Sequence, residues 1–142
     1  MTAPLKKNTS KRQTSEVCLD FMQTVQRNHI LEERFIKYVD VNQKDVFGFT
    51  ALYWAITHHN MVNVRVLLDN GARLDVTESM NAPFYAIYCD NLEVLQHFIQ
   101  KGLDCHLSRV NHRGEKITLL QYAKKLKRIE IVKYINDNDS YI

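Results

Sequence analysis

The sequence predicts an all-α fold in which short helix pairs stack side by side as a solenoid. Three observations lead to this prediction. A pattern of residues recurs at a spacing of 31, each copy holds two short amphipathic segments separated by a polar break, and the 142 residues include only 4 Gly and 2 Pro, too few for an all-β fold rich in tight turns. One helix pair cannot bury both of its apolar faces alone, so the stacking of neighbouring pairs explains why the pattern repeats.

The amino-terminal segment differs from the rest of the chain. Residues 1–15 contain four basic residues and no acidic residue, and they lack apolar periodicity, so we expect a disordered basic arm. A targeting signal, or an arm that orders against an acidic partner, is the alternative. Ser15 is the expected N-cap of the first helix, before the apolar positions Phe21, Met22 and Val25.

Charge and hydropathy narrow the class of protein. The net charge is +3, and because the arm alone carries four positive charges, the remaining residues are close to neutral. A nucleic-acid-binding surface spread over the fold is therefore not expected. No apolar run approaches the roughly 18 residues that a membrane span needs, and no apolar stretch follows the basic residues of the arm, so neither a membrane segment nor a secretory signal is expected.

The repeat is clearest in the middle of the chain. Residues 50–56 align with residues 81–87 without a gap, and the same offset places Gly71 over Gly102. A third copy begins at Thr118, 37 residues after the second, so six extra residues fall between Gly102 and Thr118. The insertion belongs in the connection between the second and third copies.

Each copy has the same order of elements. A polar N-cap, which is Thr50, Asn81 or Thr118, precedes a short apolar helix. A polar break and a second amphipathic helix follow. In two copies Gly71 or Gly102 then ends the second helix, as a residue in the left-handed conformation would.

These residues resemble the ankyrin repeat. Residues 45–56 open with Asp, Gly, Thr and Leu at the spacing of that family, and residues 63–72 close with Leu-Leu and Gly-Ala. The second copy departs at Val76, which stands where the family has its opening Asp. Departures at the two ends are expected of capping repeats, whose outer faces meet water. The resemblance implies four repeats, the first of them degenerate, at about 16–44, 45–75, 76–109 and 110–142.

The resemblance also implies short β-hairpin fingers that project from the stack. Fingers and first helices together line a concave face, on which members of this family usually bind other proteins. Phe47 and Phe49 fall at finger positions that the family leaves variable and solvent-facing, and exposed aromatic side chains there are typical of an interface anchor. The alternative is that one of them packs on the next finger or under the first repeat.

The variable positions of the concave face form the predicted partner-binding set. It consists of Val46, Phe47, Phe49, Thr57, His58, Glu78, Met80, Tyr88, Cys89, Arg113, Glu115 and Lys125. The apolar motif positions are predicted to form the core, namely Leu52, Ala55, Val64, Leu67, Leu68, Ala86, Leu95, Phe98, Ile99, Leu120, Ala123, Val132 and Ile135. Trp54 and Tyr85 are expected at a helix–helix seam, and Tyr53 is expected to support the turn.

Few residues are arranged for chemistry. His58 and His59 could start a metal site, but adjacent side chains on a turn point apart and no third ligand is spaced to join them. Cys105 beside His106 could supply a nucleophile and a base, but no Gly-rich turn or catalytic signature accompanies the pair. We therefore expect no catalytic residue, no cofactor and no metal. The basic run at residues 124–128 is either a patch for an anionic partner or a solvated helix end.

Together these features predict a non-catalytic protein-interaction module that binds and inhibits or sequesters a partner protein, in the manner of a viral or bacterial effector that binds a host factor. An immunity protein that blocks a cognate toxin or enzyme is the alternative, and a cryptic Cys/His enzyme is a remote one. Three widely spaced cysteines form no disulfide framework, which favours a cytoplasmic setting, in the host cytoplasm or nucleus if the protein is secreted or viral. A homo-oligomer is an open alternative.

Overall fold

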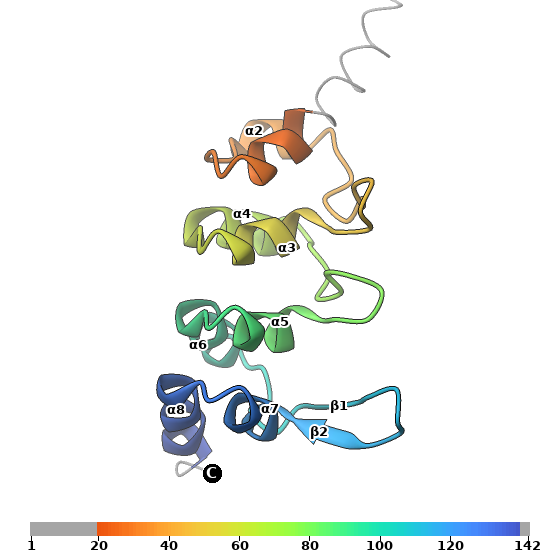
Figure 1. Ribbon diagram of the computed structural model, residues 1–142. Coiled ribbons are helices and arrows are strands. Elements are labelled where there is room, and N and C mark those ends of the chain that lie inside the picture. The colour runs from red at the N-terminus through yellow and green to blue at the C-terminus, as the bar shows by residue number, and fades with distance from the viewer. Residues whose placement is uncertain (1–19, 140–142) are drawn as a thin grey trace, which may run out of the picture.

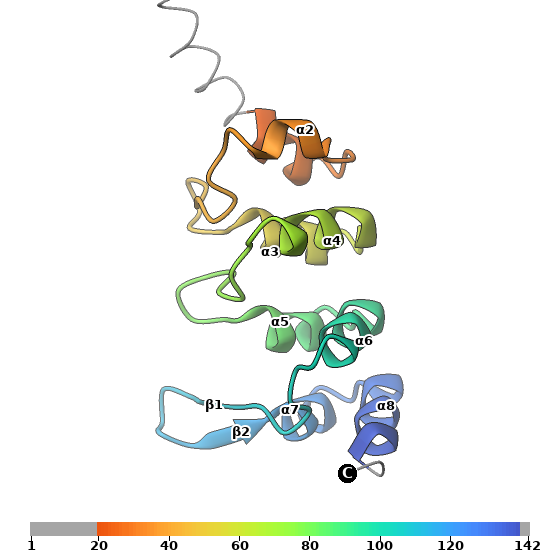
Figure 2. The ribbon, with the colours of Figure 1, turned by 180° about the vertical axis from the view of Figure 1, so that it is seen from behind.

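The computed structural model describes residues 20–139, and in it helix pairs stack in successive tiers with their hairpins projecting to one side (Figures 1 and 2). The all-α solenoid with short fingers is confirmed. The basic arm and the N-cap predicted at Ser15 lie outside the described residues. After a helix at residues 20–26, the elements are α2 (Glu33–Ile36), α3 (Ala51–Thr57), α4 (Met61–Asp69), α5 (Ala82–Tyr88), α6 (Leu92–Gln100), β1 (Ser108–Val110), β2 (Lys116–Thr118), α7 (Leu119–Lys125) and α8 (Ile129–Asp139).

The helices form two columns. In one column α3 packs on α5 and α5 packs on α7, and in the other α4 packs on α6. Within a tier the two helices also contact one another, as α3 does with α4 and α5 with α6. Each tier therefore has neighbours on both of its broad faces, except at the two ends of the stack, and this is the arrangement that the repeat predicts.

Side-chain caps begin the helices where the sequence predicts them. The first helices begin at Thr50, Asn81 and Thr118, and each cap side chain accepts a hydrogen bond from a backbone N–H in the first turn. The second helices α4 and α6 begin in the same way at Asn60 and Asn91. These bonds satisfy N–H groups that an α-helix leaves without a partner.

The core runs through the whole stack between the two columns. Most of the predicted core residues are buried; Leu68, Ile99, Leu120 and Val132 are only half-buried and pack at its margin. Several residues not assigned to the core are fully buried within it, among them Ile56, Val76, Phe84 and Ile87. Val76 stands where the family has Asp, so this position has exchanged a polar role in the finger for an apolar one.

Three hairpins project from the stack, here called the first finger (residues 45–49), the second finger (residues 76–80) and the third finger (residues 108–118). The first two are closed by single bridges, Lys44 to Thr50 and Asp75 to Asn81. The third is longer, because the inserted residues fall there, and it forms the antiparallel β1–β2 pair. Hairpin fingers are thus confirmed, but only the longest of them has regular strands.

The turn inside each helix pair uses a left-handed residue that is not glycine. Asn28, His59, Asp90 and Lys127 have φ angles of 61°, 55°, 55° and 59°. The family usually has Gly at this place. Asn and Asp tolerate this conformation because their side chains bond locally, whereas Lys has no such compensation.

We predict that Lys127→Gly stabilises the protein by about 0.5–1 kcal/mol, since it removes the left-handed strain of a Cβ and adds only the smaller entropic cost of glycine. Urea denaturation followed by circular dichroism measures the change. Lys124→Gly, at an exposed position inside α7, is the matched control and should destabilise by about 1 kcal/mol. Destabilisation by both variants would contradict the account of the turn.

Buried polar side chains tie each tier to its neighbour. Asn63 is fully buried; its Oδ1 accepts from the Leu31 N–H at 2.8 Å and its Nδ2 donates to the His29 carbonyl at 2.8 Å, which holds the first repeat to α4. Asn91 caps α6 with its Oδ1 while its Nδ2 donates to the Ile56 carbonyl at 3.1 Å. Each bond removes a backbone group that would otherwise be buried without a partner.

The last tier is tied by an arginine from the predicted basic run. Arg128 donates from Nε to the Ile87 carbonyl at 3.0 Å and from Nη2 to the Tyr88 carbonyl at 2.6 Å. The lysines of the run are exposed. Arg128 therefore holds α7 and α8 to α5, and only the lysines remain free to form the anionic-partner patch.

Asn91→Asp should lower the free energy of unfolding by about 1–3 kcal/mol, because Asp keeps the cap of α6 but leaves the Ile56 carbonyl without a donor and places a carboxylate where only 3% of the residue is exposed. Asn60→Asp is the matched control. The Nδ2 of Asn60 donates to the exposed Asn28 side chain. The Asn28 amide can rotate and donate to an Asp carboxylate instead, so the loss of unfolding free energy should stay within about 0.5 kcal/mol. Chemical denaturation measures both free energies of unfolding. Equal losses in Asn91→Asp and Asn60→Asp would argue against a stabilising role for the buried hydrogen bond from Asn91 to the Ile56 carbonyl.

Candidate partner-binding groove

The first finger is built around one carboxylate. Asp45 accepts at Oδ1 from the backbone N–H groups of Phe47 and Phe49, at 2.9 and 3.0 Å. At Oδ2 it accepts from Trp54 Nε1 at 2.7 Å and from Gln26 Nε2 at 3.1 Å. One side chain thus closes the finger turn and fixes it to both α3 and the first repeat.

The electrostatics of Asp45 follow from these bonds. Burial by itself would raise the pKa of this carboxyl, but the hydrogen bonds from Phe49, Trp54, Gln26 and Phe47 together outweigh burial and hold its pKa below the ordinary value of 3.8. Donors that point at the ionised form favour that form. Asp45 is therefore ionised at neutral pH, and the finger depends on its charge.

Aromatic rings continue from the finger along the first helices. Phe47 lies 6.1 Å from Phe49, Phe49 4.0 Å from Tyr53, Tyr53 4.6 Å from Tyr85, and Tyr85 6.0 Å from Tyr88, measured between ring centroids. We call these five residues the aromatic ladder. All four contacts are stacked, which is a favourable arrangement for ring pairs. The ladder crosses from the second repeat to the third and joins finger to helix.

Polar contacts fix the inner rungs of the ladder. The hydroxyl groups of Tyr85 and Thr57 share a hydrogen bond of 2.6 Å, and Thr57 also donates to the Tyr53 carbonyl at 2.8 Å. Burial raises the pKa of the Tyr85 phenol above its ordinary range, so that group stays neutral and acts only through hydrogen bonds. Tyr85 is therefore fixed in position and supports the exposed rings of the aromatic ladder.

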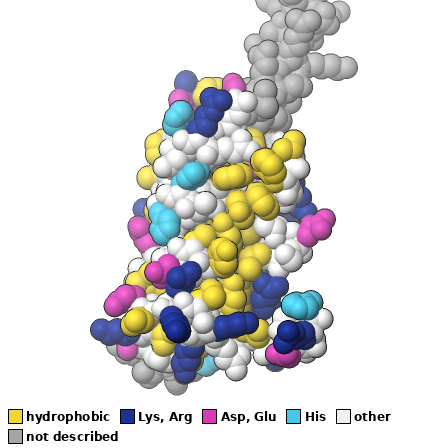
Figure 3. Space-filling view, in the orientation of Figure 1, with side chains coloured by type: hydrophobic (Ala, Val, Ile, Leu, Met, Phe, Trp, Pro, Cys, Tyr) yellow, Lys and Arg dark blue, Asp and Glu magenta, His cyan; other side chains and the backbone are white. Residues whose placement is uncertain are grey.

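An open groove of about 620 Å³ lies between the first and second fingers. Figure 3 shows hydrophobic side chains gathered in a band down the middle of one face of the molecule. The groove is lined by Val46, Phe47, Gly48, Phe49, Thr77, Glu78, Ser79, Met80, Tyr85 and Tyr88. Its rim is exposed, with 94% of Val46, 67% of Phe47 and 55% of Tyr88 open to solvent.

The third finger braces the far wall of the groove. Arg109 in β1 donates from Nη2 to the Ser79 carbonyl at 2.6 Å, its Nη1 lies 3.1 Å from Met80 Sδ, and its guanidinium lies 5.6 Å from the centre of the Phe84 ring. The second finger lacks a carboxylate like Asp45, so this contact from outside substitutes for an internal one. Both walls are consequently held in place before any partner binds.

The predicted binding residues divide between this groove and other places. Val46, Phe47, Phe49, Glu78, Met80 and Tyr88 line the groove together. Three others do not line it and are partly buried. Thr57 bonds to Tyr85, His58 contacts the Gln26 carbonyl at 2.8 Å, and burial raises the pKa of the Cys89 thiol. Arg113, Glu115 and Lys125 are exposed on the third finger and α7, away from the groove.

The two finger aromatics differ in exposure, and the ring contacts of Phe49 are neither to the next finger nor to the first repeat. Phe47 is exposed, whereas Phe49 is half-buried and packs on Tyr53 and Trp54 of its own repeat rather than on the next finger. The ring of Tyr53, expected to support the turn, is stacked between Phe49 and Tyr85. Sequence reasoning missed Thr77 and Ser79, small residues that carry no pattern of their own.

The residues weighed for chemistry lie apart from the groove. His59 is exposed at its turn, while His58 faces Gln26. Burial, followed by the negative charges of Asp139 and Asp104, raises the pKa of the Cys105 thiol, which is the opposite of what a nucleophilic cysteine needs. Among the described residues, one group could hold a metal ion, Cys105 with His106 and Asp139.

Comparison with known proteins agrees with the repeat structure. A family model for ankyrin repeats, in three copies, matches residues 21–109, and the chain therefore belongs to the ankyrin repeat family. It is also similar to the ankyrin repeat domain-containing protein SAT10 of Stachybotrys chartarum, with 33% identity over 78 residues, which cover 54% of this chain and 4% of that protein. The chain thus spans a small part of that relative. Within residues 20–139 no helix has the length and apolar character required to cross a membrane.

We predict that acid releases the first finger through Asp45. The pKa of Asp45 is depressed in the folded state, so its contribution to stability is present above the unfolded-state value and is lost as the pH falls through the folded value, below about pH 4. Trp54 is the one tryptophan in the sequence, and its emission should shift to the red in this window while the helical circular dichroism persists.

Asp45→Asn tests the assignment, because an amide nitrogen cannot accept from Trp54 Nε1. In Asp45→Asn the Trp54 emission should already be shifted to the red at neutral pH, and it should show no further transition as the pH falls below about 4. Asp69→Asn, at an exposed position on α4, serves as the control and should retain the wild-type transition. An unchanged acid transition in Asp45→Asn would contradict the role of this carboxylate.

Proposed function

We propose that this chain binds a partner protein through the groove between the first and second fingers. The observation that carries the proposal is the exposed ring of Phe47 at the tip of a finger, continuous with a ladder of stacked rings. Large apolar side chains exposed side by side are unusual on a surface that meets only water. Aromatic anchors surrounded by less critical contacts are typical of binding hot spots.

The rigidity of the groove supports the same proposal. Asp45 holds the first finger, and Arg109 braces the second. The hydrogen bond between Tyr85 and Thr57 fixes Tyr85 in the lining of the groove. A surface that is already ordered loses little conformational entropy when it binds, so more of the contact energy is available for affinity. Ankyrin repeats generally serve as protein-interaction modules, and this groove supplies a specific place for that activity.

We further propose that binding inhibits or sequesters the partner, because a rigid stack that docks along its finger side covers the surface that it contacts. A host-factor binder and an immunity protein would both use the groove in this way. The free thiols of Cys89 and Cys105 favour a reducing compartment such as the cytoplasm. Arg113, Glu115 and Lys125 are proposed as outer contacts for a partner large enough to reach the third finger.

Phe47→Ala should weaken partner binding by about 2 kcal/mol, or roughly 30-fold, because truncation removes the exposed anchor while Asp45 continues to hold the backbone of the finger. Quantitative affinity capture followed by titration of the captured protein measures the loss. Phe49→Ala is a poorer probe, since this ring is half-buried against Tyr53 and its removal would disturb the ladder itself.

Tyr38→Ala is the matched control, because Tyr38 is a comparably exposed aromatic residue outside the groove. It should leave the affinity unchanged. Equal capture by the wild type and Phe47→Ala would sink the proposal, as would an equal loss in both variants. The captured partner also separates the two versions of the role: a host protein supports the first, and a cognate toxin or enzyme supports the second.

A further inference from the structure

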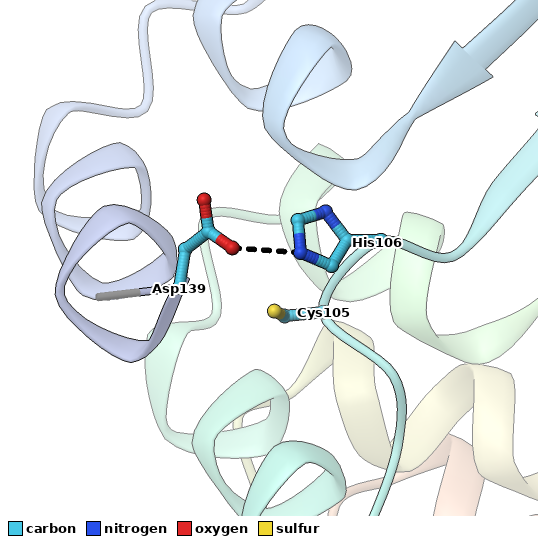
Figure 4. A group of neighbouring side chains, drawn as sticks. All are labelled: Cys105, His106 and Asp139. Atoms are coloured by element: carbon cyan, nitrogen blue, oxygen red, sulfur yellow. Dashed lines mark ion pairs between the residues drawn. The ribbon is translucent and has the colours of Figure 1, made fainter. Parts of the chain in front are cut away.

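Three side chains with metal-binding atoms converge at the carboxyl end of the stack. Cys105 and His106 follow α6, and Asp139 is the last residue of α8 (Figure 4). The Cys sulfur, a His ring nitrogen and a carboxylate oxygen all lie within 4.8 Å of one another. His106 Nε2 is 2.7 Å from Asp139 Oδ1.

The turn at residues 104–107 positions the two candidate ligands of the loop, Cys105 and His106. Asp104 accepts from the His106 N–H at 2.9 Å through its side chain and from the Leu107 N–H at 3.0 Å through its carbonyl. This turn exposes His106 while Cys105 stays buried. The equivalent positions one repeat earlier offer neither a thiol nor an imidazole, so the group belongs to the last repeat.

The three donors match the preferences of zinc. Zn²⁺ is bound in proteins by thiolate sulfur, imidazole nitrogen and carboxylate oxygen, at about 2.3, 2.0 and 2.1 Å respectively. Tetrahedral angles then require ligand atoms roughly 3.3–3.6 Å apart. Because the present atoms already lie within 4.8 Å, small side-chain rotations reach that geometry, and water can take the fourth position.

The surrounding charges favour a cation at this place. Asp104 immediately precedes the two loop ligands and accepts from the His106 N–H through its side chain, and Asp139 contacts the His106 ring. A divalent cation would neutralise these negative charges. Binding would release the thiol proton of Cys105 to solvent, and the Nε2 atom of His106 would coordinate the metal ion.

We propose that Cys105, His106 and Asp139 form a Zn²⁺ site that joins the loop after α6 to the end of α8. The site is independent of the partner-binding groove. Its consequence is mechanical, because the ligands come from two segments that are far apart in the sequence, the loop after α6 and the last residue of α8. A metal bridge would hold the end of that helix to the loop, because metal binding contributes to the stability of the fold that forms the site.

Cobalt titration of the full chain tests the site. Co²⁺ replaces Zn²⁺ in tetrahedral sites, and a bound thiolate gives a near-ultraviolet charge-transfer band. We expect this band to saturate at one equivalent of Co²⁺, to disappear when Zn²⁺ is added, and to be absent in Cys105→Ala. Zn²⁺ alone should raise the melting temperature of the wild type and not that of Cys105→Ala.

Two exposed ligands keep the test decisive if Cys105→Ala folds poorly. His106→Ala and Asp139→Asn should each weaken Co²⁺ binding by about 10-fold or more, by analogy with losses at supported metal sites. Asp137→Asn, also exposed on α8, and Cys89→Ala are the matched controls and should keep full affinity, as should Cys18→Ser.

The outcomes divide cleanly. A band that persists in Cys105→Ala, or that is lost in Cys18→Ser or Cys89→Ala, places the metal at another thiol and overturns the proposal. Equal affinities in Asp139→Asn and Asp137→Asn remove the carboxylate from the ligand set. No band and no rise in melting temperature at a stoichiometric ratio means that the three side chains form only an exposed ion pair beside a buried thiol.

Discussion

The structure depends on one constraint: each helix pair has two apolar faces, and only its neighbours in the stack can cover them. Residues such as Leu52, Val64 and Ile87 are completely or almost completely buried because helices from adjacent tiers meet over them. Polar ties then set the spacing, with Asn63 and Asn91 bonded to backbone groups of the preceding tier. Stability is therefore shared along the chain rather than held in one central core. At the last described tier, the proposed metal site would join the loop after α6 to the end of α8.

The same constraint shapes the proposed binding surface. The stacking of tiers brings the ring of Tyr53 against that of Tyr85 in the next repeat, with centroids 4.6 Å apart. The finger adds Phe47 and Phe49 to this row, and Asp45 fixes the finger by accepting from both the backbone and Trp54. The Asp45 carboxylate and the aromatic ladder therefore connect the helix stack to the candidate groove. Positions that the stack does not use remain free to recognise a partner.

The sequence predicted most of the fold because the determining signals are local. Caps at Thr50 and Asn81 and left-handed glycines at the ends of α4 and α6 can be identified from residue type and spacing. Half of the predicted binding set lines one groove, since the offset of 31 also sets which fingers are neighbours. The rest depends on side-chain directions: His58 turns toward the first repeat, and Tyr53 stacks on Tyr85 of the next repeat. The approach of Asp139 to Cys105 is set by tertiary packing, so no spacing in the sequence could reveal it.

Hydrogen exchange of the chain, free and bound to its captured partner, tests the central claim most directly, because it reports backbone protection in every repeat at once. The account predicts slower exchange at residues 46–49 and 77–80 in the complex, with little change in α4 and α6 on the opposite side. Protection confined to α4, α6 or α8, with both fingers exchanging as they do in the free chain, would contradict it.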